Sequence, residues 1–362
     1  MTIEGGLSGF PVVWHEDCLL HDPGGEVWLG QRDEGTEVPD RARVILAALT
    51  VAGATVRPAA PHDPDALLAV HDGALIRHLS TIWADWEAAG YPAEYGRHRV
   101  VPYVFPTAAM LGEMPARLPA AVHAQTGLFC YDTMTLLGPG SWAAIRAAAD
   151  SAAAAAGLIA AGLPAAYALC RPPGHHAGPA GYGGSCYLNN AAVAAQSLRQ
   201  AGAARVAILD IDAHHGNGTQ SIFYDRADVL YASVHVDPGA GWFPHYLGFA
   251  NEDGNGAGRG FTCNLPLAPG SGDGVWLAAV GDLCALVRDF AADAIVLSLG
   301  VDAAAADPES PLQVTAAAYR SAGELIGRLG PVAAIQEGGY DLASLGEYVL
   351  ATLTGVQAGR SR

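Results

Sequence analysis

The chain has 362 residues, of which 51% are hydrophobic and 15% charged, and its formal net charge at pH 7 is -17. This apolar content supports a large buried core and excludes a mostly disordered chain. The negative charge disfavours nucleic acid and anionic membranes as partners, because their phosphates would be repelled. It favours a cationic substrate, although an acidic surface also serves solubility alone.

Short β-rich runs alternate along the chain with longer helical patterns. In chain order we predict a helix at 41–52, a helix at 142–161, a strand at 165–170, a helix at 190–201, strands at 206–210 and 229–234, a helix at 276–290, a strand at 295–299, a helix at 315–329 and a strand at 332–336. Strands that are apolar on both faces are typical of parallel sheets covered on both sides. The sequence therefore predicts an α/β fold with an open, mostly parallel sheet flanked by helices on both faces.

No repeat or linker divides the chain, so we predict a single domain over residues 1–362. Residues 91–119 lose periodicity and carry several prolines, and residues 238–260 are irregular and rich in glycine. Long loops in compact domains are usually functional or form interfaces. We therefore interpret 91–119 as a loop inserted into the domain.

The six cysteines show no CxxC spacing, which predicts neither a thiolate zinc site nor a redox motif. The first residues, MTIEGGLSGF, lack a basic and apolar leader, and charged residues interrupt the long alanine-rich run at 143–161. We therefore expect a soluble, cytoplasmic protein with reduced thiols and no membrane span.

Reactive residues directly follow four of the predicted strands. They are His175 and His176 after 165–170, Asp210, Asp212 and His214 at the end of 206–210, Asp302 after 295–299, and Tyr340 after 332–336. In an open parallel sheet, ligands bind at the carboxyl ends of the strands. The four loops are therefore expected to converge on one site.

The residue types at this site suit metal-assisted hydrolysis. In an extended segment Asp210, Asp212 and His214 project to the same side, and Asp302 adds a further carboxylate. Three such ligands can hold a zinc ion that lowers the pKa of a bound water and polarises a carbonyl. A site of carboxylates with one imidazole leaves zinc and iron(II) both open.

The remaining groups supply acid–base chemistry. The tandem histidines, His175 and His176, can act as general base and general acid near neutral pH. Tyr340, on a glycine-flanked turn, can donate its hydroxyl to an oxyanion. Each motif alone is more often structural, but four of them at strand ends predict a hydrolase.

At these residues the sequence resembles the histone deacetylase family, particularly its acetylpolyamine amidohydrolase branch. The matching stretches are Arg171–Gly178, Gly183–Gln196, Ile208–Tyr224, Ser298–Pro308 and Gln336–Tyr340. The resemblance implies an arginase-like open α/β fold and zinc-dependent removal of an acetyl or related acyl group from an amine.

Carried over position by position, Asp212, His214 and Asp302 resemble the zinc ligands, and Tyr340 the tyrosine that polarises the scissile carbonyl. His175 and His176 resemble the tandem histidines, with either as the principal base. Asp210 and Asn217 resemble the residues that orient these histidines. The resemblance also implies structural potassium ions, an inner one at Asp210, Asp212 and backbone oxygens of His214, Ser233 and Val234, and an outer one around Phe223, Arg226 and Val229.

The resemblance further implies a substrate channel lined by Gly184, with Phe243 as one aromatic wall. Ser185 stands where the family usually carries tyrosine or phenylalanine, so the channel is either widened or filled by a neighbour such as Tyr182 or Tyr187. Glu26 lies in a region where the branch places an acidic residue near cationic substrates. The inserted loop at 91–119 coincides with the segment that forms a dimer contact and narrows the channel mouth.

The leading hypothesis is thus a zinc-dependent amidohydrolase acting on a small acetylated, polyamine-like amine, as a homodimer. One alternative is a deacylase of protein acetyl-lysine or of a bulkier metabolite, with a widened channel. Another is a catalytically silent relative that only binds acetylated ligands.

Overall fold

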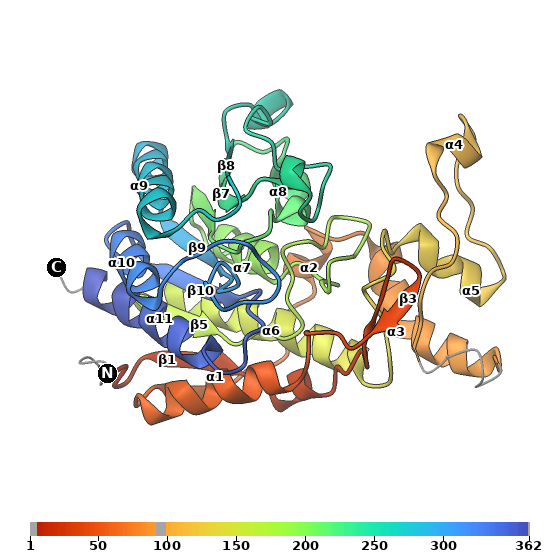
Figure 1. Cartoon of the computed structure of the whole chain (residues 1–362), viewed down its shortest axis with the longest axis horizontal. Helices are drawn as coiled ribbons and strands as arrows, with labels where there is room; N and C mark the ends of the chain where they lie inside the picture. The colour runs from red at the N-terminus through yellow and green to blue at the C-terminus, as the bar shows by residue number, and fades with distance from the viewer. Residues whose placement is uncertain (1–5, 92–98, 361–362) are drawn as a thin grey trace.

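The computed structural model describes residues 6–91 and 99–360, and its centre is an eight-stranded sheet (Figure 1). The strand order is β4-β1-β5-β10-β9-β6-β7-β8, and every neighbouring pair is parallel. The strands are β1 (Pro11–Trp14), β4 (Thr55–Pro58), β5 (Ala165–Ala168), β6 (Val206–Asp210), β7 (Val229–Val236), β8 (Thr262–Leu267), β9 (Ala294–Leu299) and β10 (Val332–Gln336). A separate antiparallel hairpin pairs β2 (Glu26–Trp28) with β3 (Gln31–Asp33).

Helices cover both faces of the sheet. One apolar cluster joins it to α1 (Asp40–Val51), α9 (Asp273–Phe290), α10 (Ala316–Gly327) and α11 (Leu345–Arg360). A second cluster, on the other face, includes α2 (Asp65–Leu68), α3 (Gly73–Ala88), α6 (Ser141–Ala160) and α7 (Asn190–Gln200). Shorter helices are α4 (Ala108–Leu111), α5 (Val122–Gln125) and α8 (Asn217–Phe223). The fold class predicted from the sequence is confirmed.

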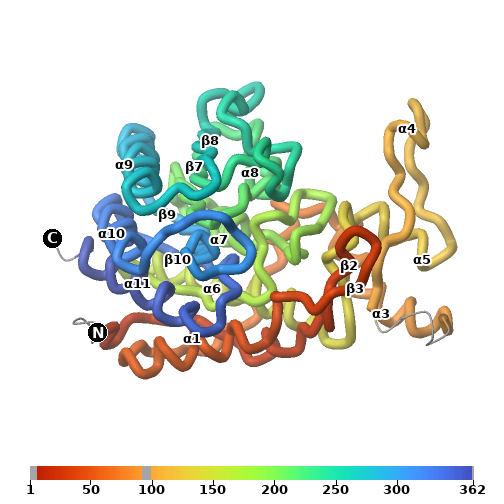
Figure 2. The backbone as a smooth tube through the Cα atoms, in the orientation of Figure 1, coloured from red at the N-terminus to blue at the C-terminus, as the bar shows by residue number. Residues whose placement is uncertain are grey.

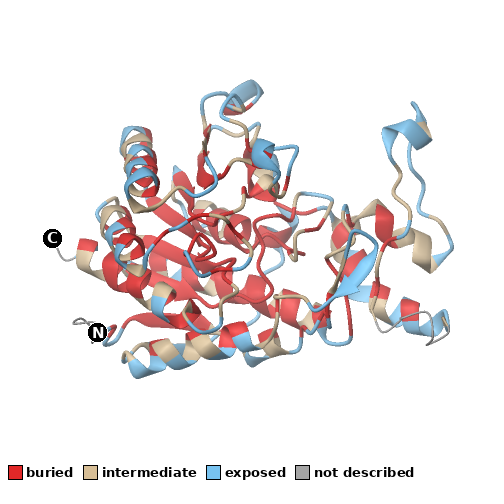
Figure 3. Cartoon of the chain, in the orientation of Figure 1, coloured by how far each residue is buried: buried red, intermediate tan, exposed pale blue. Residues whose placement is uncertain are grey.

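The alternation of side chains explains why the central strands are buried on both faces and almost wholly apolar. In β5, Ala165 and Tyr167 belong to the first cluster, whereas Ala166 and Ala168 belong to the second. Successive side chains of a strand point to opposite faces, so a strand covered on both sides must be apolar at every position. Figure 3 shows the result, a sheet buried along its whole centre.

All five predicted strands and all five predicted helices are present, with ends that differ by a few residues. Asn189 caps α7 by accepting from the Ala192 backbone N–H at 2.9 Å. The sequence analysis missed β1, β4 and β8 because these strands are short or interrupted. β4 (TVRP) is exposed along its length, and β8 (TCNLPL) contains polar residues and Pro266.

One described helix, α6, is long and apolar enough to cross a membrane by length and composition. In this structure 67% of its apolar window is buried, and the helix packs against α7 and β5. Ala148, Ala152 and Ala155 contribute to the apolar cluster of that face. The apolar character of α6 is therefore accounted for by its place in the core.

Of the inserted loop predicted at 91–119, the structure describes residue 91 and residues 99–119, and residues 92–98 lie outside the described part. Its remainder extends away from the sheet as an arm that carries α4 (Figure 2). Tyr103, Met110, Met114 and Leu118 in this arm are all exposed.

The sheet order decides where the site lies. The four strands followed by reactive residues, β5, β10, β9 and β6, are consecutive neighbours in the sheet. Parallel strands end at the same edge, so their loops meet there, as the sequence predicted.

Candidate active site

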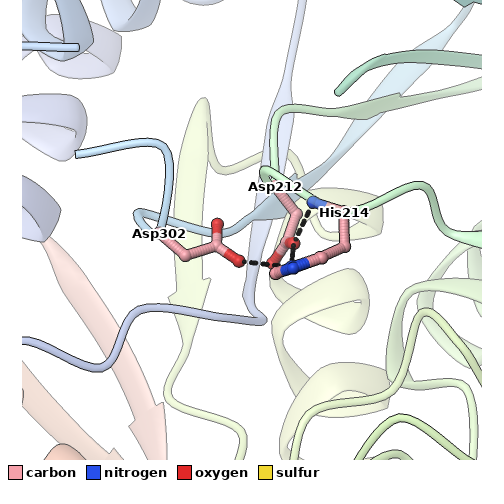
Figure 4. A group of neighbouring side chains, drawn as sticks. All are labelled: Asp212, His214 and Asp302. Carbon is pink, nitrogen blue, oxygen red and sulfur yellow. Dashed lines mark hydrogen bonds and ion pairs between the residues drawn. The ribbon is translucent and has the colours of Figure 1, made fainter. Parts of the chain in front are cut away.

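Asp212, His214 and Asp302 form a compact group beyond the ends of β6 and β9 (Figure 4). One potential ligand atom from each lies within 4.8 Å of the others. His214 Nδ1 is 3.0 Å from Asp302 Oδ2 and 3.5 Å from Asp212 Oδ1. The backbone N–H groups of Gly338 and Ala213 donate to Asp212 and Asp302 respectively, at 2.8 and 2.7 Å, and so fix both carboxylates.

The electrostatics of this group favour a cation. Both carboxylates are almost completely buried. Burial and the neighbouring Asp212 raise the pKa of Asp302 to about 7, as expected for two acids that share one buried site. Burial opposes ionisation of Asp212 as well, but His175 and His214 outweigh it and hold the pKa of Asp212 below its usual range. Two carboxylates and one imidazole at this spacing fit zinc, which takes three protein ligands in catalytic sites.

The rings of His175 and His176 lie beside this group, with centroids 4.0 Å apart and planes inclined at 46°. His175 Nδ1 lies 3.1 Å from Asp210 Oδ2, and His176 Nδ1 lies 2.7 Å from Asn217 Oδ1. Asp210 and Asn217 therefore contact the histidines that the resemblance assigned to them. The buried carboxylate of Glu337 fixes the backbone by accepting from the N–H groups of Gly174 and His175, at 2.7 and 3.1 Å.

The two histidines differ in their surroundings. Burial lowers the pKa of His175, but Asp212 and Asp210 outweigh it and raise the value to about 10. Burial, together with His175 and His214, holds the pKa of His176 well below its usual range. His176 is thus the neutral ring. Because its Nδ1–H donates to Asn217, its Nε2 is the atom free to accept a proton.

Tyr340 follows β10, and Arg41 contacts both its ring and the peptide unit that precedes it. The Arg41 guanidinium lies 4.5 Å from the centre of its ring, and Arg41 Nε donates to Gly339 O at 2.6 Å. Burial raises the pKa of Tyr340 well above its usual range, although Arg41 opposes the shift. The phenol therefore keeps its proton and can donate a hydrogen bond.

A pocket of about 460 Å³ opens onto these groups. Residues from all parts of the chain line it: Glu26, Trp28, Thr36, Met134, His176, Gly184, Ser185, His214, Gly241, Trp242, Phe243, His245, Glu309 and Tyr340. All three residues predicted to line a channel are among them. The predicted histidine ligand, one tandem histidine and the tyrosine thus face the same space.

Position 184 requires glycine for two reasons, its backbone conformation and the lack of space for a side chain. Its φ of +57° lies in the left-handed region, and a Cβ there would lie 2.5 Å from His176 Cδ2 and 2.8 Å from Phe243 Cε1. The Phe243 ring stands edge-on to the His176 ring at 4.7 Å. The pocket wall therefore packs directly on His176.

Ser185 lines the pocket, and neither Tyr182 nor Tyr187 is among the lining residues. Both tyrosines are fully buried, and the Tyr187 hydroxyl donates to the backbone oxygen of Leu136. The alternative in which one of them fills the space beside Ser185 is therefore wrong.

Two carboxylates line the same pocket, and the sequence analysis had considered only Glu26. Burial raises the pKa of Glu26 to about 7, and the nearby acids Glu309, Asp33 and Asp132 add to this shift. Glu309 accepts from the Thr36 hydroxyl at 2.8 Å, which orients its carboxylate. The signal that could have revealed Glu309 is its position in the loop that begins at Asp302, after β9. Trp28, Trp242 and His245 were also missed.

Comparisons with known proteins identify the family of the chain. Residues 35–356 match the model of the family described as histone deacetylase domain. The chain is 43% identical over 348 residues to acetylpolyamine amidohydrolase from Mycoplana ramosa, covering 95% of this chain and 99% of that one. It is 41% identical over 350 residues to acetylpolyamine amidohydrolase 1 from Pseudomonas aeruginosa, covering 95% and 98%.

A crystal structure of acetylpolyamine aminohydrolase from Burkholderia pseudomallei has the same fold. Its TM-score is 0.90 at 40% identity, covering 97% of this chain and 99% of that one. The family resemblance inferred from the sequence is confirmed. The chain therefore belongs to the histone deacetylase family and is a hydrolase of the deacetylase type.

Proposed function

We propose that this protein removes the acetyl group from small, positively charged N-acetylated amines of the acetylpolyamine type. The observation that carries the proposal is one pocket in which His176, His214 and Tyr340 meet two carboxylates, Glu26 and Glu309. The first set suits amide hydrolysis, and the second suits an ammonium group. The names of the relatives from Mycoplana ramosa and Pseudomonas aeruginosa support the same substrate class.

Asp212, His214 and Asp302 are the proposed ligands of a zinc ion. A zinc ion bound there would lower the pKa of its bound water and polarise the carbonyl of the amide substrate. Iron(II) suits the same three ligands. Zinc is the physiological metal that we propose. Structural potassium, inner at Asp210 and outer near Phe223, is proposed from the family resemblance.

The protein's own side chains divide the remaining work. His176, neutral and lining the pocket, takes the proton of the attacking water at Nε2 and returns it to the leaving amine. His175, behind it, is held by Asp210. The Tyr340 hydroxyl donates to the amide oxygen and stabilises the oxyanion that forms there.

Recognition of the amine is assigned to Glu26 and Glu309. A partly buried carboxylate next to other acids is unfavourable when ionised, which is why the pKa of Glu26 is raised to about 7. An ammonium group bound between the two acids would relieve that repulsion. Neutral acetylated amines gain nothing from this contact, so charge selects the substrate.

The second candidate is a deacylase for bulkier substrates, including acetyl-lysine peptides. It is favoured by Ser185, which occupies one pocket wall where the family usually carries an aromatic ring. The missing ring leaves room for a wider amine or acyl group. A catalytically silent protein that only binds acetylated ligands is disfavoured, because such a protein would not need the catalytic side chains that this pocket brings together.

We also propose that the protein acts as a homodimer through the arm at 99–119. Exposed apolar side chains on the arm, such as Met110 and Met114, are candidates for burial against a second copy. None of the described arm residues lines the pocket within one chain. A contribution of the arm to the pocket mouth would therefore come from the second subunit.

The test is an assay of the purified, zinc-loaded protein on three substrates, of which the charged diamine and the neutral amide have equal length. An N-acetylated diamine should be hydrolysed with a higher kcat/KM than the neutral N-alkylacetamide and than an acetyl-lysine peptide. Equal kcat/KM for the charged and neutral amides would refute charge recognition. Preference for the peptide would favour the second candidate instead.

A further inference from the structure

The residue to which we assign a new role is Asp307, in the loop between β9 and α10. Asp307 is buried, and its carboxylate does not line the pocket. It nevertheless contacts two residues that do. Its Oδ2 accepts from the Tyr340 backbone N–H at 2.6 Å, and its Oδ1 accepts from the Glu309 backbone N–H at 3.0 Å.

The contact with Tyr340 controls a single peptide unit. Gly339 O and Tyr340 N belong to the same peptide bond, and each has a charged partner. Arg41 Nε donates to the oxygen at 2.6 Å, and Asp307 accepts from the nitrogen. Because a peptide unit is planar, fixing both ends fixes its orientation, and with it the direction in which the Tyr340 side chain leaves the backbone.

Asp307 holds the following residue as well. Its Oδ2 also accepts from the Asp341 N–H, at 3.2 Å. Hydrogen bonds to an ionised carboxylate are stronger than those between neutral groups, and burial protects them from competing water. The turn that carries Tyr340 is thus anchored to the loop that carries Glu309.

We propose that Asp307 is a positioning residue that sets the Tyr340 hydroxyl and the Glu309 carboxylate in a fixed relation. This inference rests on the proposed function, in which Tyr340 binds the amide oxygen and Glu309 the distant ammonium. The Asp307 carboxylate then fixes the distance that the pocket accepts between the acetyl group and the ammonium group of a substrate. Catalysis and charge recognition are coupled through one buried side chain.

The decisive variant is Asp307→Asn. The amide has one acceptor oxygen and no charge, so it cannot hold the Glu309, Tyr340 and Asp341 N–H groups together, and each contact that remains is weaker. Asp273→Asn is the matched control, because Asp273 also accepts from a distant backbone N–H, that of Thr315 at 2.7 Å, and lies outside the pocket lining. Both proteins are compared by kinetics and by amide hydrogen exchange.

We expect Asp307→Asn to lower kcat on an N-acetylated diamine by roughly tenfold to a hundredfold, as a misplaced catalytic group does. In a Tyr340→Phe background, the same change should lower kcat by less than about threefold, because the group that it positions is already gone. Amide exchange should rise at residues 309, 340 and 341. Asp273→Asn should change neither the kinetics nor the exchange at these residues.

Equal losses in the wild-type and Tyr340→Phe backgrounds, or unchanged exchange at 340 and 341, would overturn the role of Asp307. If Asp307→Asn does not fold, Asp307→Ser, which retains one acceptor oxygen, takes its place in the same comparison. Failure of the proposed function is distinct: the wild-type protein would then not hydrolyse the acetylated diamine, or Tyr340→Phe would keep full turnover. Amide hydrogen exchange at residues 309, 340 and 341 measures the hydrogen bonds to Asp307 directly and does not require turnover.

Discussion

Replacing Glu309 by glutamine removes one negative charge from the pocket and keeps the shape of the side chain. Glutamine can still accept from the Thr36 hydroxyl, the contact that orients residue 309. A hydrogen bond to a charged group contributes about 1.5–3 kcal/mol. Glu309 is only partly buried, so solvent screening places the expected loss near the lower end of that range. A loss of about 1.4 kcal/mol corresponds to a tenfold weaker complex.

The assay is steady-state kinetics on an N-acetylated diamine and on a neutral N-alkylacetamide of the same length. Glu309→Gln should raise KM for the charged substrate by roughly tenfold, by the same conversion, and leave the neutral one unchanged. Glu34→Gln, an exposed residue outside the pocket lining, removes the same charge and controls for the general field of the protein. The reasoning is refuted if both substrates change equally, or if Glu34→Gln has the same effect.

Three further predictions concern the same pocket. Tyr340→Phe should lower kcat by about 10²–10³-fold, the usual loss of one oxyanion donor, while zinc content measured by elemental analysis stays the same; unchanged turnover contradicts its role. The pKa of Glu26 is raised to about 7, so Glu26 is neutral below that pH and charged above it. The ratio of kcat/KM for charged over neutral substrate should therefore rise with pH through about 7 in the wild type, and a ratio that rises equally in Glu26→Gln argues against Glu26. Ser185→Tyr should narrow the pocket and shift kcat/KM towards slim acetylated diamines over acetyl-lysine peptides; a shift towards peptides is the opposite of what the geometry requires.

The central sheet was predictable because the residue pattern within each strand is enough to identify it. β5, β6, β9 and β10 are buried at every position and apolar except at Asp210, Ser298 and Gln336, and only strands covered on both faces need such a pattern. The same strands lead directly into His175, Asp212, Asp302 and Tyr340. A general rule for parallel sheets therefore predicts that the candidate metal ligands and the tandem histidines lie at one edge of the sheet.

The pocket walls were less predictable because they depend on contacts between distant segments. Glu309 is oriented by Thr36, 273 positions away in the sequence. Trp242 and His245 come from the irregular stretch 238–260, which has no periodicity from which a direction could be read. His235 Nε2 lies 2.8 Å from Gly248 O in this stretch, and Glu252 Oε2 accepts from Gly248 N at 3.0 Å. Such contacts become visible only in the folded chain.

Polar residues buried behind the site escaped the sequence analysis for a related reason. Glu37 links Arg41 to Arg171 by ion pairs of 2.9 and 2.8 Å, and Arg41 in turn reaches Gly339 beside Tyr340. A charged residue in a helix such as α1 is ordinarily interpreted as part of a solvated face. Only tertiary packing shows that Arg41 is 2% exposed and supports the site.

The account depends most on a metal ion held by Asp212, His214 and Asp302. Its most direct test is the metal content of the purified protein after zinc loading and removal of excess metal. The wild type and the surface control Asp289→Asn should each retain about one zinc ion per chain, as three-ligand catalytic sites do. Asp302→Asn should lose the ion while remaining folded by circular dichroism. A wild-type protein that stays metal-free, or an Asp302→Asn variant that keeps its zinc, would contradict the account.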